Sequence, residues 1–539
     1  MRILTSDEVR QAVQEATSRS QVTVSMLMQR AGYAVAQFCA SHFKFSSACV
    51  VCGKGHNGGE GLAAAEALRR IANEVAVIIL ARDASELSAE TAEMFSQLSS
   101  EPIWIGGEAE LDSPAARDAL AADLIVDAIA GALDPLPLST LDGKAVEAIN
   151  GAFGTVVSVD LPSGVDGDSK ERARESSQQM VFAHGIIGFV APKPAHAFGE
   201  LTSGPIAVSE IGVQPALVGN KTGLEVVTGQ EVGIAFPPRP DDAHKGQFGH
   251  VLVIAGSRGK AGAAGLAGIA ALRAGAGLVT VACPRSIQVT VASFAPELMT
   301  EDLPETEEGT IAVAAAQNAY ALLRGKDVIV LGPGLSTNGQ TAEFVRQFVS
   351  RCRLPVVLDA DGLNAFAGHP ADLKPEGEAA PFRVLTPHPG EAARLTGSSI
   401  TEIQADRQEA ARRIARDTGC CVALKGWRTV VAGASGETWI NMSGNPAMAK
   451  GGSGDVLSGV IAAALARRAG GEVTTGKEAT FLNDLRVAAA VHLHGMAGDV
   501  ARDALNENTV LATDVAENLT EAFGECEVQV DRGLFYLRK

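Results

Sequence analysis

Short apolar runs, glycine-rich turns and helical stretches follow one another along almost the whole chain. The first such set is the apolar run 48–52, the glycine-rich loop 53–61 and the helical stretch 62–70. An apolar run of this length between turn residues is typical of a strand that is buried on both faces. A strand that leads through a glycine loop into a helix is also a unit that can bind a nucleotide. Repetition of this unit predicts an α/β protein whose parallel strands are covered by helices.

Two domains are expected, because 539 residues exceed what one hydrophobic core usually holds. A proline-rich, acidic run at 237–242 disfavours helix and suits a connecting segment. We therefore predict a Rossmann-like domain at 1–215, a linker at 216–240 and a doubly wound domain at 241–539. The other expected elements are a helix at 6–16 and strands at 75–80, 124–127, 155–160, 251–255, 278–282, 328–331, 355–359, 384–386 and 422–424.

Charge and composition argue against several classes of protein. The formal net charge of −18 disfavours broad binding to nucleic acid or to an anionic membrane. The first residues lack the apolar segment of a signal peptide, and no apolar run reaches the roughly 20 residues that span a bilayer. Eight scattered cysteines fit a reducing compartment, so we expect a cytoplasmic protein that acts on small molecules. Cys49 and Cys52 have redox spacing, but a strand would turn them to opposite faces.

The segment 444–455 is a glycine-rich turn that leads directly into an apolar helix. The backbone N–H groups of Gly452, Ser453 and Gly454 and the positive end of the helix dipole would point at one place, which suits an anion. Asp455 would lie where a carboxylate takes the proton of a substrate hydroxyl while charge develops on a phosphoryl group. The simpler alternative is a helix start without a ligand.

Gly334, His388 and Lys425 each follow one of the strands expected in the C-terminal half. Ligands of open α/β sheets collect at the carboxyl ends of the strands. We therefore expect these three residues to meet Asp455 in one cleft.

Each of these residues also has a purely structural interpretation. His388 lies between two prolines and would alternatively brace a turn, and Lys425 would alternatively be a solvated surface lysine. A metal site at His492 and His494 is disfavoured, because residues two apart on a helix do not face each other.

Seven motifs follow one another in the C-terminal half, at residues 246–257, 262–264, 271–279, 332–335, 359–361, 386–391 and 424–426. In this order they resemble the ADP-dependent NAD(P)H-hydrate dehydratases, a branch of the ribokinase-like fold. From about 4 to 212 the chain instead resembles the NAD(P)H-hydrate epimerase domain that is often fused ahead of the dehydratase. Together the two resemblances cover nearly the whole chain.

The dehydratase resemblance implies a site for a hydrated nicotinamide nucleotide, NADHX or NADPHX, next to a site for ADP. It places Asp455 at the reacting hydroxyl. The implied substrate-binding residues are Ala263, Gly334, His388 and Asp455. The implied nucleotide-binding residues are Lys425, Gly426, Thr429, Gly452, Ser453 and Gly454.

The substrate dictates the chemistry. Hydroxide is a poor leaving group, whereas a phosphorylated oxygen leaves readily when the lone pair of the ring nitrogen expels it. A kinase-like site supplies what this phosphoryl transfer needs, and magnesium is expected to offset phosphate charge. With ADP as donor, which the resemblance alone implies, the products are NAD(P)H, phosphate and AMP.

The epimerase resemblance implies conversion of the R to the S hydrate with a bound potassium ion, which suits hard oxygen ligands. Lys193 and Asp160 are the pair expected to transfer protons. The implied potassium ligands are Asn57, Asp127 and Ser163. The implied substrate-binding residues are His56, Asn57, Gly58, Gly59, Glu60, Gly131 and Asp160.

The N-terminal half also departs from the family pattern. His56 stands where asparagine is usual, Glu60 where aspartate is usual, and Gly188 where threonine is usual. A threonine-glycine pair is missing after Gly131, where Ala132 follows. Displacements of about 1 Å cost on the order of a hundredfold in rate, so a domain that only binds is the alternative for this half.

The whole chain has a rival interpretation as well. A small vitamin-precursor or sugar kinase would use the same glycine loop with ATP, because a fold does not fix a function. The fused N-terminal domain argues against it. We also expect a homo-oligomer.

Overall fold

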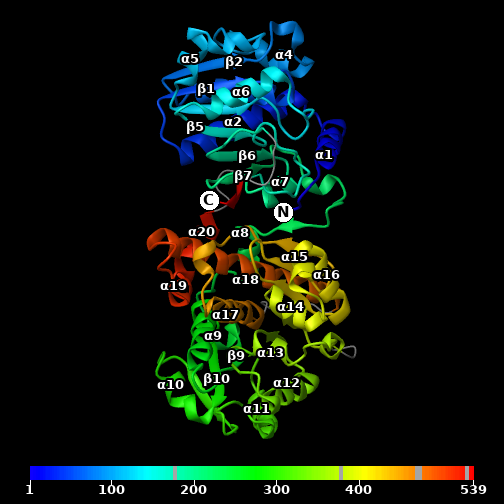
Figure 1. Cartoon of the computed structure of the whole chain (residues 1–539), viewed down its shortest axis with the longest axis vertical. Helices are drawn as coiled ribbons and strands as arrows, with labels where there is room; N and C mark the ends of the chain where they lie inside the picture. The colour runs from blue at the N-terminus through cyan, green and yellow to red at the C-terminus, as the bar shows by residue number, and fades with distance from the viewer. Residues whose placement is uncertain (174–178, 376–379, 468–475, 529–532, 539) are drawn as a thin grey trace. The chain divides into compact units, whose positions relative to one another are not determined.

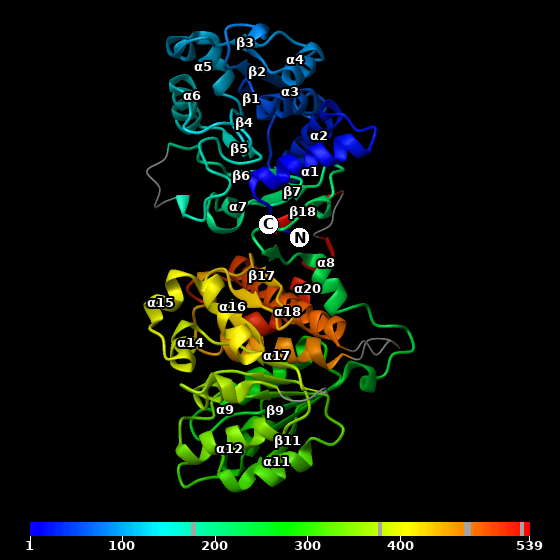
Figure 2. The same cartoon turned by 90° about the vertical axis from the view of Figure 1, so that its right-hand side faces the viewer.

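The computed structural model describes residues 1–173, 179–375, 380–467, 476–528 and 533–538. The chain divides into two compact units (Figures 1 and 2). The first runs from Met1 to Val226 and includes the end of the chain, and the second runs from Val227 to Val528. The functional boundaries at 215 and 241 stay a prediction, because compactness does not fix where each activity resides.

The first unit is built on a sheet with the strand order β18-β7-β6-β5-β4-β1-β2-β3. Neighbours from β7 to β3 are parallel, and β18 is antiparallel to β7. The helices are α1 (Ser6–Arg19), α2 (Val24–His42), α3 (His56–Leu68), α4 (Ala89–Ser96), α5 (Pro114–Leu120), α6 (Thr140–Asn150) and α7 (Pro194–Phe198). The strands are β1 (Ser47–Cys52), β2 (Glu74–Ile79), β3 (Ile103–Trp104), β4 (Leu124–Ala128), β5 (Thr155–Val159), β6 (Gly185–Phe189), β7 (Ile206–Ser209) and β18 (Leu534–Arg538), with the short β8 (Glu225–Val226) at the end of the unit's main segment.

Both faces of this sheet are covered, as the continuous apolar strands predict. Val50 and Cys52 of β1 pack in one core with α2 and α3, whereas Cys49 and Val51 pack in another with α5 and α6. The two cysteines therefore face opposite sides of the sheet, and both thiols are free and buried. Burial raises the pKa of the Cys49 thiol to about 12, which leaves it unreactive.

Helix α3 begins earlier than the sequence suggests. The glycine loop was expected to extend to residue 61, but the helix starts at His56 after the N-cap Gly55. A Cβ on Gly58 would overlap the carbonyl oxygen of Gly53. Because these positions carry no side chain, the first turn of the helix packs directly onto the end of β1.

The last described residues of the chain complete the first unit. Leu534 and Tyr536 of β18 are buried in the same core as α2. The Tyr536 hydroxyl lies 3.1 Å from Nε2 of His42. Without β18, the edge of β7 would be open.

The second unit has the strand order β11-β10-β9-β12-β13-β14-β15-β16-β17. Its helices are α8 (Gly229–Ala235), α9 (Ala261–Arg273), α10 (Gln288–Ala292), α11 (Ala316–Leu322), α12 (Gly339–Arg351), α13 (Asp361–Asn364), α14 (Pro389–Thr396), α15 (Ile400–Ala405), α16 (Arg407–Thr418), α17 (Ser453–Ala466), α18 (Lys477–Ala504), α19 (Ala512–Glu517) and α20 (Leu519–Val528). Its strands are β9 (His250–Ile254), β10 (Leu278–Pro284), β11 (Met299–Leu303), β12 (Val328–Leu331), β13 (Val356–Leu358), β14 (Arg383–Leu385), β15 (Cys421–Leu424), β16 (Val430–Ala432) and β17 (Thr438–Ile440).

The prediction that all strands of the second sheet are parallel is wrong at one edge. Strands β11 to β15 are parallel, but β15, β16 and β17 are antiparallel neighbours. The connection between β16 and β17 is a tight turn in which the N–H of Gly433 donates to the carbonyl of Glu437 at 2.8 Å. A connection this short joins antiparallel strands only, since parallel strands need a long crossover.

Helices α9 and α17 lie side by side against this sheet (Figure 1). Their small residues share a core with the inward faces of β9 and β12. Within the described residues, no helix is both long enough and apolar enough to span a membrane.

Candidate functional sites

In the first unit, Asp160 and Lys193 form a buried ion pair at the carboxyl ends of β5 and β6. The Lys193 ammonium contacts Oδ1 of Asp160 and donates to the carbonyl oxygen of Phe189 at 3.1 Å. The Ala132 N–H donates to Oδ2 of Asp160 at 2.9 Å. Ala132, one of the departures from the family pattern, thus contributes its backbone to the carboxylate.

The ion pair fixes the charge of this carboxylate. Burial alone would raise the pKa of Asp160, but the charge of Lys193 and the hydrogen bonds outweigh it and lower the pKa below its usual value. Asp160 is therefore ionised at neutral pH.

Two more carboxyl groups lie in the electrostatic surroundings of this pair. Burial and the charge of Asp160 raise the pKa of Glu60 well above its usual value. Burial also raises the pKa of Asp134, whose Oδ2 accepts the Gly131 N–H at 2.9 Å. The first unit therefore combines an ionised carboxylate with neighbours that hold their protons more tightly.

Asn57 is placed beside Asp160 by Gly131. A Cβ on Gly131 would lie 3.0 Å from Oδ2 of Asp160 and 3.1 Å from Oδ1 of Asn57. Asn57 is 3% exposed, and within the described structure neither side-chain amide atom has a hydrogen-bond partner. A buried amide without partners is costly, so this group suits a bound ligand or cation.

Asp127 and Ser163 are engaged with each other. The Ser163 hydroxyl donates to Oδ1 of Asp127 at 2.5 Å, and the Ser163 N–H donates to Oδ2 at 2.9 Å. Ser158 adds a third donor at 2.8 Å and Ile129 a fourth at 3.4 Å. Of the three expected potassium ligands, Asn57 is thus the one whose oxygen accepts no hydrogen bond among the described residues.

The remaining loop residues divide into exposed and packed positions. His56 is exposed on the first turn of α3. Gly59 is buried, and a Cβ there would lie 2.8 Å from Sδ of Met28. Gly58 and Gly59 therefore serve close packing.

One residue of this site carries no signal in the sequence. His196 is 1% exposed, and its ring contacts the backbone of both Asp160 and Lys193. A lone histidine in an apolar stretch is not distinctive, so only the fold reveals it.

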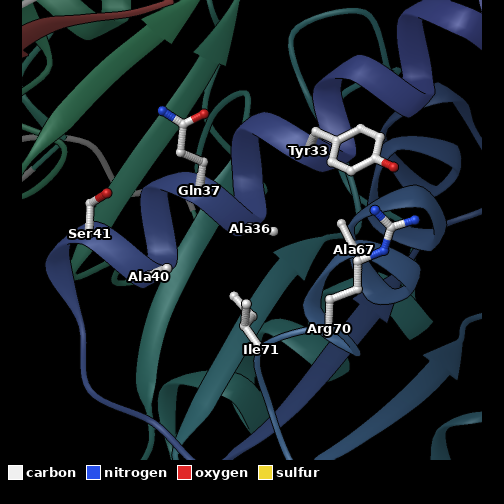
Figure 3. Close-up of a pocket in the computed structure, with 8 residues that line it drawn as sticks. All are labelled: Tyr33, Ala36, Gln37, Ala40, Ser41, Ala67, Arg70 and Ile71. Carbon is white, nitrogen blue, oxygen red and sulfur yellow. The ribbon is translucent and has the colours of Figure 1, made fainter. Parts of the chain in front are cut away.

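A separate surface pocket of about 460 Å³ lies between α2 and the end of α3. Figure 3 shows the Tyr33 ring beside the Arg70 side chain, with Gln37 and Ser41 further along α2. The Arg70 guanidinium lies 5.2 Å from the centre of the Tyr33 ring. None of the predicted site residues, all of which lie in the described part of the chain, lines this pocket.

In the second unit, Asp455 lies on the first turn of α17. Gly452 precedes the helix with φ 96°, a left-handed conformation that favours glycine, and no side chain caps the helix. A 14-residue helix with an uncapped start directs N–H groups and partial positive charge at this point. The expected anion site is thus formed by the local geometry.

Lys425 reaches the same point from the end of β15. Its Nζ donates to Oδ1 of Asp359 at 2.7 Å and lies 3.8 Å from Oε2 of Glu391. A Cβ on Gly454 would lie 3.3 Å from this ammonium. The structure therefore brings Lys425 and the start of α17 together.

The charges around Asp455 oppose its ionisation. Burial, followed by the charge of Asp359, raises the pKa of Asp455 to about 7, although Lys425 acts in the opposite direction. The pKa of Lys425 is itself raised, because the attraction of Asp359 and Glu391 outweighs burial. Asp455 thus titrates near neutral pH beside a permanent cation.

His388 both caps a helix and remains accessible. Its Nδ1 accepts the Gly390 N–H at 3.0 Å at the start of α14, and its own N–H donates to Glu391 at 2.8 Å. This is the turn-bracing arrangement that the sequence offered as an alternative. The side chain is nevertheless 51% exposed, and its Nε2 lies 3.4 Å from Oε1 of the buried Glu391.

Gly334 and Ala263 are adjacent. Gly334 has φ 63°, and a Cβ on it would lie 2.9 Å from Cβ of Ala263. The Ser257 hydroxyl fixes the Gly334 carbonyl at 2.7 Å.

The other residues expected to bind the nucleotide form one turn. Gly426 has φ 141°, and the Thr429 hydroxyl donates to its carbonyl at 3.0 Å.

Asp359 is the residue whose position the sequence does not reveal. It is 1% exposed, and its carboxylate accepts a hydrogen bond from the Lys425 ammonium and another, at 2.9 Å, from the hydroxyl of Ser458 on α17. Asp359, at the end of β13, therefore contacts both parts of the anion site, which are Lys425 and helix α17. Its motif at 359–361 contributed to the family resemblance without indicating this role.

The described residues contain no cluster of three or more histidine, cysteine, aspartate or glutamate side chains that could hold a metal ion by themselves. His494 is buried, and burial lowers the pKa of its ring to about 4.

Comparisons with known proteins agree on both halves. Residues 251–521 match the family model described as NAD(P)H-hydrate dehydratase, and residues 24–195 match that described as YjeF-related protein N-terminus. A bifunctional NAD(P)H-hydrate repair enzyme of Moorella thermoacetica is 36% identical over 98% of this chain and 98% of its own length. One from Escherichia coli is 32% identical over 95% and 92%. A solved ADP/ATP-dependent NAD(P)H-hydrate dehydratase from Bacillus subtilis is 29% identical, with a TM-score of 0.47, and covers 56% of this chain and 98% of that chain.

Proposed function

The chain belongs to the family of bifunctional NAD(P)H-hydrate repair enzymes, and we propose that its two sites share the repair of hydrated NAD(P)H. The C-terminal site dehydrates the S hydrate at the expense of a nucleotide. The N-terminal site converts the R hydrate into the S hydrate. The observation that carries the first assignment is Asp455, a carboxyl group with pKa about 7 at an uncapped helix start beside Lys425.

In the dehydration, Asp455 takes the proton of the ring hydroxyl as the hydroxyl oxygen attacks the terminal phosphoryl group of ADP. The bond from that phosphorus to the bridging oxygen breaks, and AMP leaves. The lone pair of the ring nitrogen then expels phosphate, and a proton leaves the neighbouring ring carbon to restore NAD(P)H. A base with a pKa near the working pH is the most effective for the first step.

The nucleotide is held by charge and backbone N–H groups. Lys425 is already positioned by Asp359, so its ammonium meets a phosphate without reorganising. The N–H groups at the start of α17 receive the charge that develops during transfer. ADP as the preferred donor is part of this proposal.

Magnesium fits this site only as a companion of the nucleotide. Magnesium is usually bound by one or two carboxylates together with substrate phosphates, and the described residues offer no larger cluster. Asp359 and Asp361 are the carboxylates whose charges reach Asp455 and help to raise its pKa. When bound, the ion offsets phosphate charge.

In the N-terminal site, Asp160 and Lys193 transfer the protons that inversion of the hydrated ring carbon requires. The ionised Asp160 is suited to accept a proton, and Lys193 is suited to return one. Potassium is proposed at the Asn57 amide oxygen, the expected ligand oxygen that accepts no hydrogen bond in the described structure. Potassium would there supply positive charge beside the substrate.

The rival functions have less support. A vitamin-precursor or sugar kinase would not need an N-terminal unit with a paired aspartate and lysine, and the bifunctional relatives match both halves of the chain. A purely binding N-terminal unit would not need a buried ion pair, which is costly to form. A cytoplasmic location and a homo-oligomer remain part of the proposal.

The test is to incubate the full chain with hydrated NADH and to follow the return of NADH absorbance. With the S form and ADP, NADH should reappear, and AMP and phosphate should appear in equal amounts. With a mixture of R and S forms, conversion should reach completion faster than spontaneous epimerisation allows. If NADH does not return with either ADP or ATP, the proposed function is wrong.

A further inference from the structure

We propose that His196 is a positioning residue for the epimerase reaction and that Gly188 provides the space its ring needs. This inference rests on the proposed role of Asp160 and Lys193. His196 lies on α7, one turn beyond Lys193, and contacts the backbone of both residues.

The imidazole of His196 bridges the two halves of the ion pair. Its Nδ1 accepts the backbone N–H of Lys193 at 3.0 Å. Its Nε2 donates to the backbone carbonyl of Asp160 at 2.8 Å. These two bonds require the neutral tautomer with its proton on Nε2, and burial lowers the pKa of His196 to about 4, so that this form persists at neutral pH.

The bridge holds a residue whose backbone is in an uncommon conformation. Asp160 has φ 64°, a left-handed conformation that is uncommon for a residue with a side chain. Its N–H donates to the carbonyl of Ile187 at 2.8 Å, and its carbonyl is the group that His196 holds. The two bonds therefore fix the direction of the carboxylate, whereas the contact with the Lys193 ammonium fixes only a distance.

Gly188 lies directly against the ring. A Cβ on Gly188 would lie 3.1 Å from Cε1 and 3.2 Å from Nε2 of His196. Such contacts are tighter than ordinary packing, so a side chain at 188 would push the ring away from the Asp160 carbonyl. Glycine at 188, one of the departures from the family pattern, therefore leaves the space that the His196 ring occupies.

His196 touches no group that reacts, so its loss should affect turnover through orientation. A misplacement of about 1 Å costs on the order of a hundredfold in rate. The KM for the R hydrate should change little, since the ion pair itself remains. A residue that served stability alone would lower the melting temperature and leave turnover unchanged.

The experiment compares His196→Leu, His196→Asn, Gly188→Thr and the double variant Gly188→Thr/His196→Leu in the full chain. The readout is kcat and KM for epimerisation of the R hydrate, with dehydration of the S hydrate by the second unit as the internal control. His196→Leu should lower the epimerase kcat roughly ten- to hundredfold. His196→Asn should recover part of this, because its amide oxygen can still accept the Lys193 N–H.

Gly188→Thr should lower kcat by a similar factor, and the double variant should lose less than the product of the two, since residues in contact are not additive. If His196→Leu fails to fold, Gly188→Ala replaces it as the variant that disturbs the His196 ring. His184→Leu is the matched control, because His184 accepts the Val156 N–H at 3.0 Å at the other end of β5. It should leave kcat unchanged.

Nuclear magnetic resonance of the ring nitrogens gives a readout besides activity. His196 should keep its proton on Nε2 and should not titrate from about pH 5 to 8. The proposal is overturned if His196→Leu keeps the wild-type kcat, if single and double variants are additive, or if His196 titrates in that range. Failure of the wild-type chain to epimerise would instead overturn the proposed function.

Discussion

The two sites place an aspartate at the carboxyl edge of a sheet and treat its charge in opposite ways. Asp160 contacts the buried Lys193 ammonium, which lowers the pKa of the carboxyl group. Asp455 has Asp359 as a stronger electrostatic neighbour than Lys425, and its pKa rises to about 7. The two sites differ in the partner of the lysine. Lys193 pairs with Asp160, the proposed catalytic carboxylate, whereas Lys425 pairs with Asp359, a neighbour of the proposed catalytic Asp455.

This difference suits the two proposed reactions. A base that attacks a hydroxyl proton benefits from a pKa near the working pH, as Asp455 has. A group that takes and returns a proton within a buried pair needs a fixed position, as Asp160 has. The residue that the lysine pairs with therefore sets the charge of the aspartate in each site.

The largest effect is expected from Asp455→Asn. Loss of the general base should lower the dehydration rate about 10²–10⁴-fold, because asparagine cannot accept the proton. The measurement is NADH formation from the S hydrate and ADP. Epimerisation of the R hydrate by the same protein should be unchanged and serves as the control. A variant that kept more than about a tenth of the wild-type rate would remove Asp455 from the mechanism.

Asp160→Ala should lower the epimerase activity and leave the dehydratase activity unchanged, the reverse of what is expected for Asp455→Asn. The rate of R hydrate consumption should fall to the spontaneous epimerisation rate, because the remaining Lys193 has no carboxylate to exchange protons with. Dehydration of the pure S hydrate should keep its wild-type rate. If the wild type and the variant consume the R hydrate equally, both at the spontaneous rate, the N-terminal site only binds.

Lys425→Ala tests whether the lysine of the second site binds the nucleotide. A charged hydrogen bond is worth about 1.5–3 kcal/mol, so the KM for ADP should rise roughly ten- to hundredfold while that for the S hydrate changes little. Lys450→Ala is the matched control, because this exposed lysine of the same glycine-rich segment donates to the Asn508 carbonyl at 2.7 Å. An unchanged KM for ADP in Lys425→Ala would contradict the assignment.

The sequence predicts a strand reliably where a run of apolar residues ends in a glycine turn. Four or five consecutive apolar residues before a glycine turn predict β1, β9 and β12, because burial on both faces leaves no polar position in these runs. β16 and β17 have only three residues each, too few to show a period. β18 exists because it pairs with β7, more than 300 residues earlier, which no local pattern encodes.

The same limit applies to the sites. The glycine-rich segment 444–455 correctly predicted that Asp455 lies at the start of a helix, whereas the loop at 53–61 did not predict where α3 begins. Asp359 and His196 were missed, because their roles depend on distance and burial. The bond between Asp359 and Ser458 joins residues 99 apart in the chain. Side chains that position others are therefore the part of a site that sequence alone reveals least.

Leu534→Ala tests whether the end of the chain supports only the first unit. Removing a buried leucine side chain costs about 2–5 kcal/mol, and Leu534 is 1% exposed in the core of the first unit. On heating, the variant should lose epimerase activity well before dehydratase activity. Phe535→Ala, at the half-buried position next to it, is the control and should have a smaller effect. Equal loss of both activities in Leu534→Ala would contradict the assignment of β18 to the first unit.

The smallest effect is a shift in pH dependence. Because Asp455 must be ionised to accept a proton, kcat/KM for dehydration should fall as the pH drops through about 7. The charge of Asp359 holds this pKa up, so in Asp359→Asn the acidic limb should move to lower pH. The raised pKa also means that the folded state binds this proton more tightly than the unfolded chain, so Asp455 should reduce stability as the pH rises from about 4 to about 7.

Ser458→Ala is the control for the Asp359→Asn measurement, because it removes one hydrogen bond to Asp359 and leaves the charge in place. Its acidic limb should stay near that of the wild type. The epimerase profile should be the same in all three proteins, since Asp160 titrates below the range in which Asp455 does. An acidic limb that stays at the same pH in Asp359→Asn would show that burial alone sets the pKa of Asp455, and the contrast between the two lysine partners would then lose its electrostatic basis.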